Sequence, residues 1–377
     1  ANRLESIRTQ VIKTAWMPAI ELNAQASWQS DVVAFDLDLP FPVDFPQIPR
    51  DQYRVTLDIS QVIYDGGAVR SSQAIEAINS RISRQEVDVG EVTLIETVVD
   101  LYFAILLIDR RIDLLNLMRS SLEATGKQVE SGISGGLLSE PDLLGIRAEM
   151  VGIDQSELQL KNLRNRALNA MGHLTGLTTT PETTLITPDT PPISLLGEAR
   201  PEFGLFQLRI DLLDAQSRQL GDRHKPRLAA FGQAGYGRPG LNFLGDTWDP
   251  YLMIGMRFSW TPYDWGRIRG QQNALNINQL HLASAREAFR QQLHIAHDRQ
   301  NMVITEINSL MAGDRNLLEI RQQVTTAYAS RLANGLITSA AYLTEWSREQ
   351  EARITLETRR VELLAAQHKL VIINGNN

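Results

Sequence analysis

The sequence predicts an α+β fold in which amphipathic β-strands lead directly into α-helices of unusual length. Three observations predict it: the second half of the chain repeats the first, four short segments alternate apolar and polar side chains, and long proline-free stretches carry a heptad pattern. The 377 residues are enough for more than one ordinary domain. The formal net charge of −7 does not suggest a nucleic-acid partner, and the absence of cysteine removes disulfides and thiol chemistry.

The internal repeat is the strongest signal in the chain. Residues 199 positions apart are identical from a strand, through a long helical stretch, to a distant glycine turn. The pairs include Ser60 and Ser259, Arg70 and Arg269, Leu94 and Leu293, and Leu144 and Leu343. Upstream, Pro18 and Pro226 align at an offset of 208, because the first half has the longer loop between its strands. We therefore expect a first repeat over residues 1–176, a Thr/Pro-rich linker over 177–200 and a second repeat over 201–377.

Each half carries two predicted strands, at about 18–34 and 52–64 and at about 226–238 and 250–262. In the second strand of each half, one face is apolar, with Tyr53, Val55, Leu57 and Ile59 matching Leu252, Ile254, Met256 and Phe258. Such strands either pack one face on a soluble core or, at about ten residues, cross a bilayer at a tilt. Four strands cannot close a barrel, and an open sheet edge cannot lie in lipid. Three copies of the chain would supply a closed barrel of twelve strands, with the loops 35–51 and 238–250 at its outer end.

The remaining sequence predicts two antiparallel helical hairpins, over 67–176 with a tip at about 132–139 and over 266–373 with a tip at about 332–338. The first hairpin carries a heptad seam: Leu94, Val98, Leu101, Ile105, Ile108, Ile112 and Leu115. About 65 residues of helix would extend roughly 100 Å. A plain coiled-coil rod would explain the heptads but not the four strands. No run of about 20 apolar residues is present, and because the chain starts at Ala1 inside a predicted helix, we expect a leader and some mature residues to be missing.

Short motifs at the strand–helix corners and at the hairpin tips resemble the TolC-like outer-membrane efflux proteins. The corner motifs are Ile63–Gly67 (IYDGG) and Tyr263–Gly266 (YDWG), the tip motifs are Gly136–Leu144 and Gly335–Leu343, and Leu174–Leu177 reads LTGL. The similarity runs from about Thr14 to Asn374. It implies a homotrimer in the outer membrane of a Gram-negative bacterium, with a 12-stranded β-barrel continuous with an α-helical coiled-coil barrel in the periplasm. Such proteins are the passive exit ducts of tripartite efflux or type I secretion systems.

The resemblance also implies partners and site residues. Besides outer-membrane lipid, the partners would be a periplasmic adaptor protein and an inner-membrane pump, with no cofactor and no nucleic acid. The adaptor would dock on the two tips: Gly135, Gly136, Leu137, Leu138, Ser139, Asn334, Gly335, Leu336, Ile337 and Thr338. Glycine permits the left-handed end of a helix, and Ser139 and Thr338 can cap the helices that follow. The strand–helix corners would be Tyr64, Asp65, Gly67, Tyr263, Asp264 and Gly266.

One departure from the family concerns the gate. Relatives close the periplasmic mouth with acidic residues just after the second tip, where this chain has Ala341 and Thr344. Ile337 stands where relatives have an arginine that locks the closed state. Glu140, Asp142 and Glu345 are therefore the candidate gate residues.

Signals for chemistry are weak. His294, His297 and Asp298 have a spacing that could bring them together on a helix as a metal site, but solvated helix residues explain them better. No nucleophile–base pair stands out, so we expect no catalytic or metal site. Two alternatives to an export duct remain: a structural coiled-coil envelope protein or adhesin without a pore, and a periplasmic enzyme.

Overall fold

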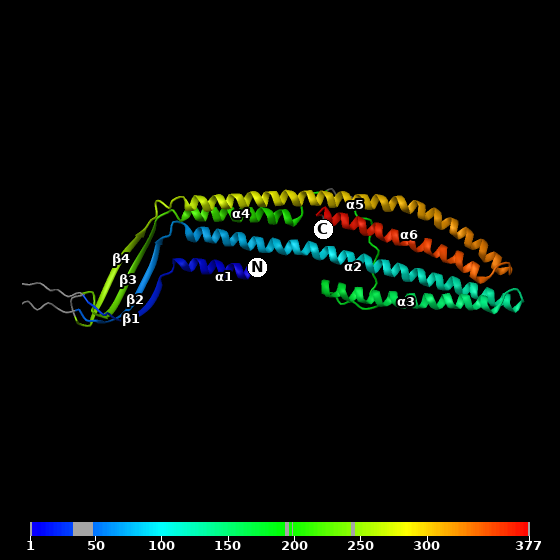
Figure 1. The fold of residues 1–377 in the computed structure, drawn as a ribbon, viewed down its shortest axis with the longest axis horizontal. Coiled ribbons are helices and arrows are strands. Elements are labelled where there is room, and N and C mark those ends of the chain that lie inside the picture. The colour runs from blue at the N-terminus through cyan, green and yellow to red at the C-terminus, as the bar shows by residue number, and fades with distance from the viewer. Residues whose placement is uncertain (1, 33–47, 193–195, 198, 243–245, 376–377) are drawn as a thin grey trace, which may run out of the picture. The chain divides into compact units, whose positions relative to one another are not determined.

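The computed structural model describes residues 2–32, 48–192, 196–197, 199–242 and 246–375, with helices and strands in the order that Figure 1 labels. The elements are α1 (Asn2–Lys13), the 3-10 turn η1 (Thr14–Trp16), β1 (Ala19–Trp28), β2 (Asp51–Tyr64), α2 (Ala68–Ser134), α3 (Glu140–Thr175), α4 (Pro201–Asp222), β3 (Arg227–Arg238), β4 (Asp249–Ser259), α5 (Arg267–Ala333) and α6 (Ser339–Ile373). The chain divides into two compact units. One comprises residues 1–86 and 204–286, and the other comprises residues 87–203 and 287–377.

The first unit contains a single four-stranded antiparallel sheet with the strand order β1-β2-β3-β4 (Figure 1). Its two hairpins have the same register: Ala19 pairs with Ser60 as Arg227 pairs with Ser259. The first strand ends at Trp28 and does not continue toward residue 34, where the sequence had predicted its end. The carboxylate of Asp31 accepts a hydrogen bond from the next backbone N–H, a local bond that competes with strand pairing. Residues 33–47, with most of the predicted loop 35–51, lie outside the described residues, as do 243–245 in the second loop.

The two faces of the sheet differ in chemistry. One face exposes apolar side chains: Ile254 is 77% exposed and Phe258 is 64% exposed. On the other face, the Asp58 carboxylate accepts hydrogen bonds from Asn23 (2.9 Å), Thr56 (2.7 Å) and Gln233 (2.5 Å). Each strand therefore places its polar side chains on the face opposite to its apolar ones, as the alternation predicted.

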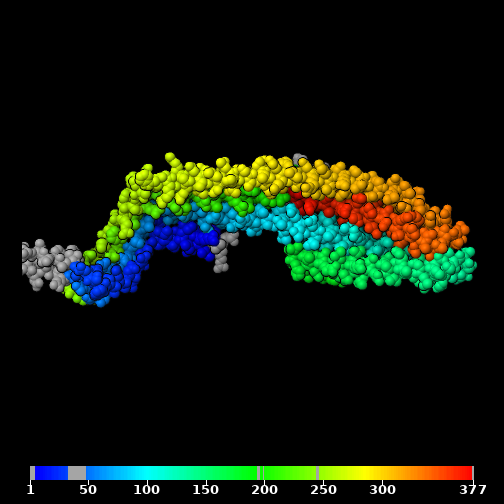
Figure 2. All heavy atoms as spheres, viewed as in Figure 1, coloured from blue at the N-terminus to red at the C-terminus, as the bar shows by residue number. Residues whose placement is uncertain are grey.

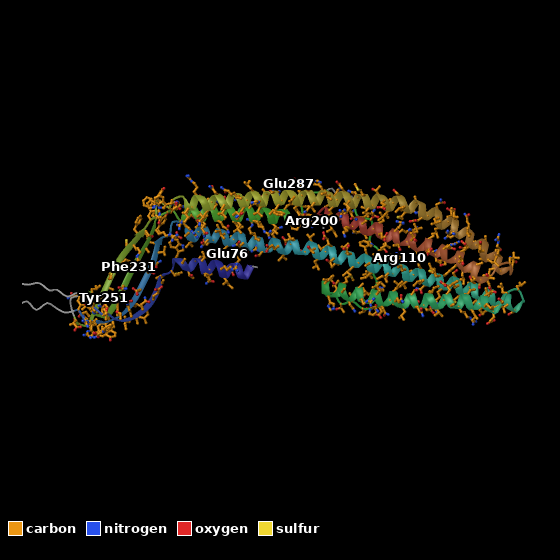
Figure 3. All side chains as sticks on the ribbon, in the orientation of Figure 1. Glu76, Arg110, Arg200, Phe231, Tyr251 and Glu287 are labelled. Atoms are coloured by element: carbon orange, nitrogen blue, oxygen red, sulfur yellow. The ribbon has the colours of Figure 1, made fainter. Side chains whose placement is uncertain are left out.

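Two aromatic rings lie over glycines on the polar face of the second hairpin, where Figure 3 labels Phe231 and Tyr251. Gly255 is the cross-strand neighbour of Phe231, and Gly235 is that of Tyr251. A Cβ atom at either glycine would lie within 2.7 Å of the facing ring, so only glycine fits. The first hairpin has polar pairs at the equivalent positions, Asn23 with Thr56 and Ser27 with Gln52.

Helices flank the sheet ends in the same unit. Helix α1 lies along α2, where Glu5 pairs with Arg84 (2.5 Å) and Arg8 with Glu76 (3.2 Å; Figure 3 labels Glu76). Helix α4 contacts both α5, where Gln272 donates to the carbonyl of Ser217, and α2. A helix thus precedes each strand hairpin, α1 before β1 and α4 before β3. Helix α4 lies between the long helices α2 and α5.

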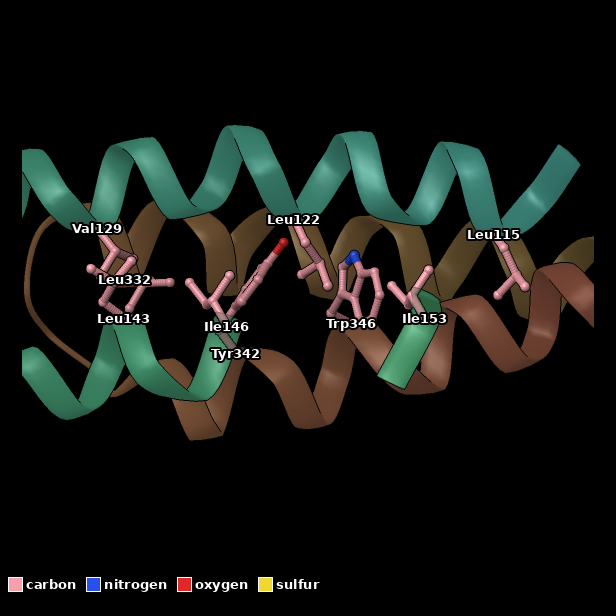
Figure 4. Close-up of a cluster of buried hydrophobic side chains, with 9 residues drawn as sticks. All are labelled: Leu115, Leu122, Val129, Leu143, Ile146, Ile153, Leu332, Tyr342 and Trp346. Carbon is pink, nitrogen blue, oxygen red and sulfur yellow. The ribbon is translucent and has the colours of Figure 1, made fainter. Parts of the chain in front are cut away.

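The second unit is built from parts of α2 and α5 with α3 and α6, which come together at the hairpin tips (Figure 2). The core at this end draws its buried residues from all four helices, and Figure 4 shows them: Leu115, Leu122, Val129, Leu143, Ile146, Ile153, Leu332, Tyr342 and Trp346. The heptad seam of the first hairpin therefore continues into a core that it shares with the second hairpin.

The predicted linker carries no helix or strand in the part of 177–200 that the structure describes. Arg164, on α3, fixes it in place: its guanidinium donates to the carbonyls of Pro181 and Thr183, both at 2.6 Å, and pairs with Asp109 at 2.5 Å. This arginine is nearly buried, with its side chain 12% exposed. Among the described residues, no helix is long and apolar enough to cross a membrane.

Candidate functional site

The two hairpin tips have the same backbone turn. In the first, Gly136 has a φ of +74°, and the N–H groups of Gly136 and Leu137 donate to the carbonyls of Ile133 and Gly132. In the second, Gly335 has a φ of +67°, and the N–H groups of Gly335 and Leu336 donate to the carbonyls of Leu332 and Arg331. The paired bonds satisfy the last carbonyls of each long helix, as a left-handed glycine end does.

The helices that follow the tips begin at capped residues. Thr338 accepts a hydrogen bond from the N–H of Ala341 (3.4 Å) and starts α6. Ser139 starts α3, and both its N–H (3.1 Å) and its hydroxyl (2.6 Å) donate to the Asp142 carboxylate. The two residues lie where the sequence predicted helix caps.

Asp142 ties the two tips together. Its second oxygen accepts the N–H of Ser339, from the other hairpin, at 2.8 Å, and the residue is only 8% exposed. The hydrogen bond from the Ser139 hydroxyl, aided by those from the backbone, lowers the pKa of Asp142 to about 2 although burial acts in the opposite direction. The carboxylate is therefore charged and fully engaged inside the chain at neutral pH.

A close backbone approach reinforces this link between the hairpins. A Cβ atom on Gly335 would lie 2.8 Å from the carbonyl oxygen of Leu137 in the first tip. Gly136 has no atom within 4 Å of its Cβ position. The second tip glycine is thus required for packing as well as for its backbone angle, whereas the first is required for the angle alone.

The predicted docking residues divide into exposed and packed side chains. Leu137 and Leu336 are 59% and 72% exposed, so they place apolar groups at the end of the hairpins. Leu138 and Ile337 are half-buried against the tip core. The exposed Asn334 donates its amide to the carbonyl of Ser330 (2.8 Å). The other predicted docking residues are all exposed: Gly135, Gly136, Ser139, Gly335 and Thr338.

The three candidate gate residues are not equivalent. Glu140 is exposed, whereas Asp142 is buried in the contact just described. Glu345 is half-buried between two arginines of its own hairpin, Arg321 at 3.2 Å and Arg348 at 2.5 Å. The sequence did not single out these arginines, because 24 residues separate Arg321 from Glu345 and no motif links them. Ser339 aligns with Glu140 at the start of the other helix, but this alignment does not predict its bond to Asp142.

The two strand–helix corners are held by the same pattern of hydrogen bonds. The carboxylate of Asp65 accepts the N–H groups of Gly67 (2.8 Å) and Val69 (2.6 Å), and that of Asp264 accepts those of Gly266 (3.0 Å) and Ile268 (2.8 Å). These bonds cap α2 and α5, and the bond from Ile268 is the main cause that lowers the pKa of Asp264. Tyr64 and Tyr263 precede the caps and are 47% and 67% exposed.

The two corners differ in what covers them. Gly66 has a φ of +74°, and a Cβ atom there would lie 2.9 Å from the Cβ of Lys225, in the connection between α4 and β3. The equivalent residue of the second corner is Trp265, which has a φ of +58° and is 88% exposed. A left-handed tryptophan is strained, and the ring of Trp265 lies edge-on to that of Tyr263, with 5.0 Å between the ring centroids.

The suspected histidine cluster does not form. Nδ1 of His297 donates to the side-chain oxygen of Asn374 (2.8 Å), just beyond the end of α6, and Nε2 accepts from the side-chain amide of Asn301 (2.9 Å). Among the described residues, no group of three or more His, Asp or Glu side chains is placed to hold a metal ion.

Solved structures share this fold over the whole chain. The outer-membrane channel OprN matches with a TM-score of 0.70 and 17% identity, over 100% of this chain and 85% of that one. CusC matches with a TM-score of 0.74 and 12% identity, over 100% and 87%. The outer-membrane channel MtrE of Neisseria gonorrhoeae, solved in its open state, matches with a TM-score of 0.68 and 16% identity, over 99% and 84%. The comparison with curated proteins gives no match.

The fold is therefore that of outer-membrane channels that combine a small sheet with long helical hairpins. Residues 5–177 match the family model described as outer membrane efflux protein. This match confirms the resemblance predicted from the corner and tip motifs.

Proposed function

We propose that the chain is one third of a trimeric outer-membrane channel that provides the passive exit duct of a tripartite efflux or type I secretion system. The observation that carries the proposal is the sheet. Its apolar face is exposed, and its outer strands, β1 and β4, have no further strand beside them among the described residues. Three such sheets would form a closed twelve-stranded barrel, with lipid on the apolar face and water on the face that holds Asp58.

The helical hairpins would form the periplasmic tunnel, and their tips would bind an adaptor protein that links the channel to an inner-membrane pump. Exposed Leu137 and Leu336 offer apolar contacts at the end of each hairpin. The side chains of an adaptor hairpin would pack between them, as helices pack on apolar ridges. The channel itself catalyses no reaction, so the pump supplies the energy for export.

Opening would be a shift between two packings of the tips. Asp142 stabilises the closed packing, because its carboxylate bonds Ser139 in one hairpin and Ser339 in the other. Separating the hairpins breaks the contact with Ser339 and exposes part of the shared core, so adaptor binding must replace both. Glu140 directly follows the first turn, and the Glu345–arginine cluster lies on α6 beyond the second turn.

A coiled-coil envelope protein without a pore is the competing function. It explains the long heptad helices but requires a protein surface to cover the apolar face of the sheet. Lipid covers that face without a further component.

The deciding experiment measures the native mass of the detergent-extracted protein and its conductance in a planar bilayer. A mass of three chains of 42.2 kDa, after correction for detergent, together with discrete pores supports the channel. A detergent-independent monomer or dimer without conductance contradicts it and favours the coiled-coil scaffold. Small or mostly closed pores still support the channel, because the tips close the tunnel.

A further inference from the structure

A groove between α2 and α4 reaches the end of the sheet. It has a volume of about 910 Å³ and lies wholly within the first unit. Along the same contact, Gln219 of α4 donates to Ser72 of α2 at 3.0 Å. Small and apolar residues make up part of its lining: Gly67, Ala74, Ile78, Ala215 and Gly221. The rest of the lining is polar or charged, so the groove offers both kinds of contact to a ligand.

Aromatic side chains mark the level of the membrane surface at this end of the sheet. Tyr64, Leu228 and Phe258 are cross-strand neighbours and therefore share the apolar face. Trp260 directly follows β4, is 56% exposed, and donates its indole N–H to the carbonyl of His224 at 2.9 Å. Tyrosine and tryptophan, with an apolar body and a polar tip, are typical of the boundary between lipid and water. Residues just beyond them, toward the helices, therefore lie at the depth of lipid headgroups.

Two cations lie at the end of the groove nearest the sheet, which we call its entrance. Arg70 and Lys225 both line the groove, and both are exposed. Lys225 can approach the corner because residue 66 is glycine: a Cβ atom on Gly66 would lie 2.9 Å from the Cβ of Lys225. Lys225 also interacts electrostatically with Arg70 and with Tyr64. The two cations thus form a cluster with a tyrosine of the apolar face.

The carboxylates nearest the entrance are already engaged. Asp222 accepts hydrogen bonds from Lys225 (2.7 Å) and from the hydroxyl of Ser71, and Asp65 caps α2. The hydrogen bond to Asp222 raises the pKa of Lys225, which keeps its ammonium charged at neutral pH. In the described part of the chain, no carboxylate lies within ion-pair distance of Arg70. The entrance therefore has a positive charge that the chain does not offset.

The other two carboxylates of the groove lie away from the entrance. Asp211 and Asp214 are separated from Asp222 by about 12 Å or more along α4. Asp214 pairs with Arg218, and Asp211 accepts the side-chain amide of Gln207 at 2.9 Å. Among the residues that the structure describes, these bonds leave no carboxylate at the entrance to receive an ammonium group. The entrance therefore favours a ligand that carries a negative charge and no cation.

We propose that Arg70 and Lys225 bind the phosphate of an anionic phospholipid whose acyl chains cover the adjoining apolar face, while the uncharged glycerol of its headgroup enters the groove. Guanidinium and ammonium groups both donate charge-assisted hydrogen bonds to phosphate oxygens. Phosphatidylethanolamine fits less well, because its ammonium would lie among the two cations. The inference rests on the proposed outer-membrane channel, since membrane insertion is what brings lipid to this end of the sheet, and it adds a lipid class to that function.

Native mass spectrometry of the detergent-solubilised protein tests the site, because one spectrum reports both the mass of the assembly and the lipids that it retains. The delipidated protein is mixed with equal amounts of phosphatidylglycerol and phosphatidylethanolamine that carry the same acyl chains. We expect preferential retention of phosphatidylglycerol, with one bound lipid per chain. In R70Q/K225Q the preference should fall by at least about tenfold, since each cation near lipid phosphate contributes about fivefold.

Three further variants separate charge from folding. Arg70→Gln alone leaves the bond between Lys225 and Asp222 intact and should lower the preference about fivefold. R70K/K225R keeps both charges and should retain the preference. Arg81→Gln removes an exposed cation from the same helix, about three turns beyond Arg70, and should behave like the parent. An equal loss in Arg81→Gln would show that general charge, and not this entrance, selects the lipid.

The outcomes distinguish this site from the proposed function. Equal retention of the two lipids by a trimeric parent, or an undiminished preference in R70Q and R70Q/K225Q, overturns the lipid site while the channel stands. Glycerol phosphate added in excess should not displace the bound lipid, because it lacks the acyl chains. Displacement would mean that the entrance recognises a soluble phosphate instead. A spectrum without trimers, from protein that forms no pores, contradicts the proposed function and the lipid site together.

Discussion

The helical tip and the four-stranded sheet place their apolar side chains in opposite ways. At the tip, Leu122 and Ile146 are fully buried and Trp346 is 2% exposed, within one chain. On the sheet, Leu252 and Ile254 are 66% and 77% exposed. A single chain thus completes the core of its tip, whereas the apolar face of its sheet needs a covering from outside. The comparison indicates that folding and assembly depend on different ends of the same repeat, and substitutions can separate them.

The largest effect is expected at Trp346, the biggest side chain of the tip core. Trp346→Ala should lower the free energy of unfolding by about 3–5 kcal/mol, because it opens a cavity between four helices. Thermal unfolding followed by circular dichroism measures this loss. Leu336→Ala, at a tip position that is 72% exposed, is the control and should change stability by less than about 0.5 kcal/mol. Equal stability of the two variants would mean that the tip core is not formed as described.

A charge on the apolar face of the sheet should act on membrane insertion instead. Ile254→Arg is expected to disfavour the inserted barrel by about 2–4 kcal/mol per chain, the value for arginine facing lipid at mid-depth. The neighbouring Met253→Arg faces the opposite side and should insert like the parent. Flotation of vesicles after refolding measures the inserted fraction. If both variants insert equally well, the assignment of the lipid face is wrong.

The tip glycines sharpen the comparison within the tip itself. Gly335→Val and Gly136→Val should both abolish export while trimers still form, because valine is strained at a positive φ. The loss of stability should be larger at Gly335, up to about 3 kcal/mol, since its Cβ would also approach the carbonyl of Leu137 to 2.8 Å. Retention of a fluorescent dye in cells reports export, and native mass reports the trimer. Full export by both variants would refute a role for the tips.

The smallest of the four effects concerns pH. Because the pKa of Asp142 falls from 3.8 to about 2 on folding, its stabilisation is complete above pH 4 and is lost as the pH falls through about 2. The amount is about 2 kcal/mol. Asp142→Asn should therefore be less stable than the parent at pH 6, and the difference should shrink toward pH 2. A difference that does not change with pH would show that the charge of Asp142 does not stabilise the tips.

Much of the fold was accessible from the sequence because the relevant signals are local or repeated. Alternating side chains predicted the strands. Asp65 and Asp264 belong to the corner motifs, and each caps the helix that follows its corner. The Asp142 side chain was singled out as an acid at the tip, but its partner Ser339 lies 197 residues away. Contacts of this kind depend on how two hairpins meet, which a local pattern does not encode. The hydrogen bond from Arg164 to the linker was not predicted from the sequence for the same reason.

The sequence by itself determined the repeated order of helix and strand, the apolar face of the sheet and the glycine turns at the tips. These follow from the period of the side chains and from backbone angles that only a few residues adopt. Only the tertiary structure decided which copy of a repeated feature is covered. Gly66 lies under Lys225, whereas Trp265 at the equivalent corner is exposed, because β3 follows β2 in the sheet and, in the part of the chain that the structure describes, no strand follows β4.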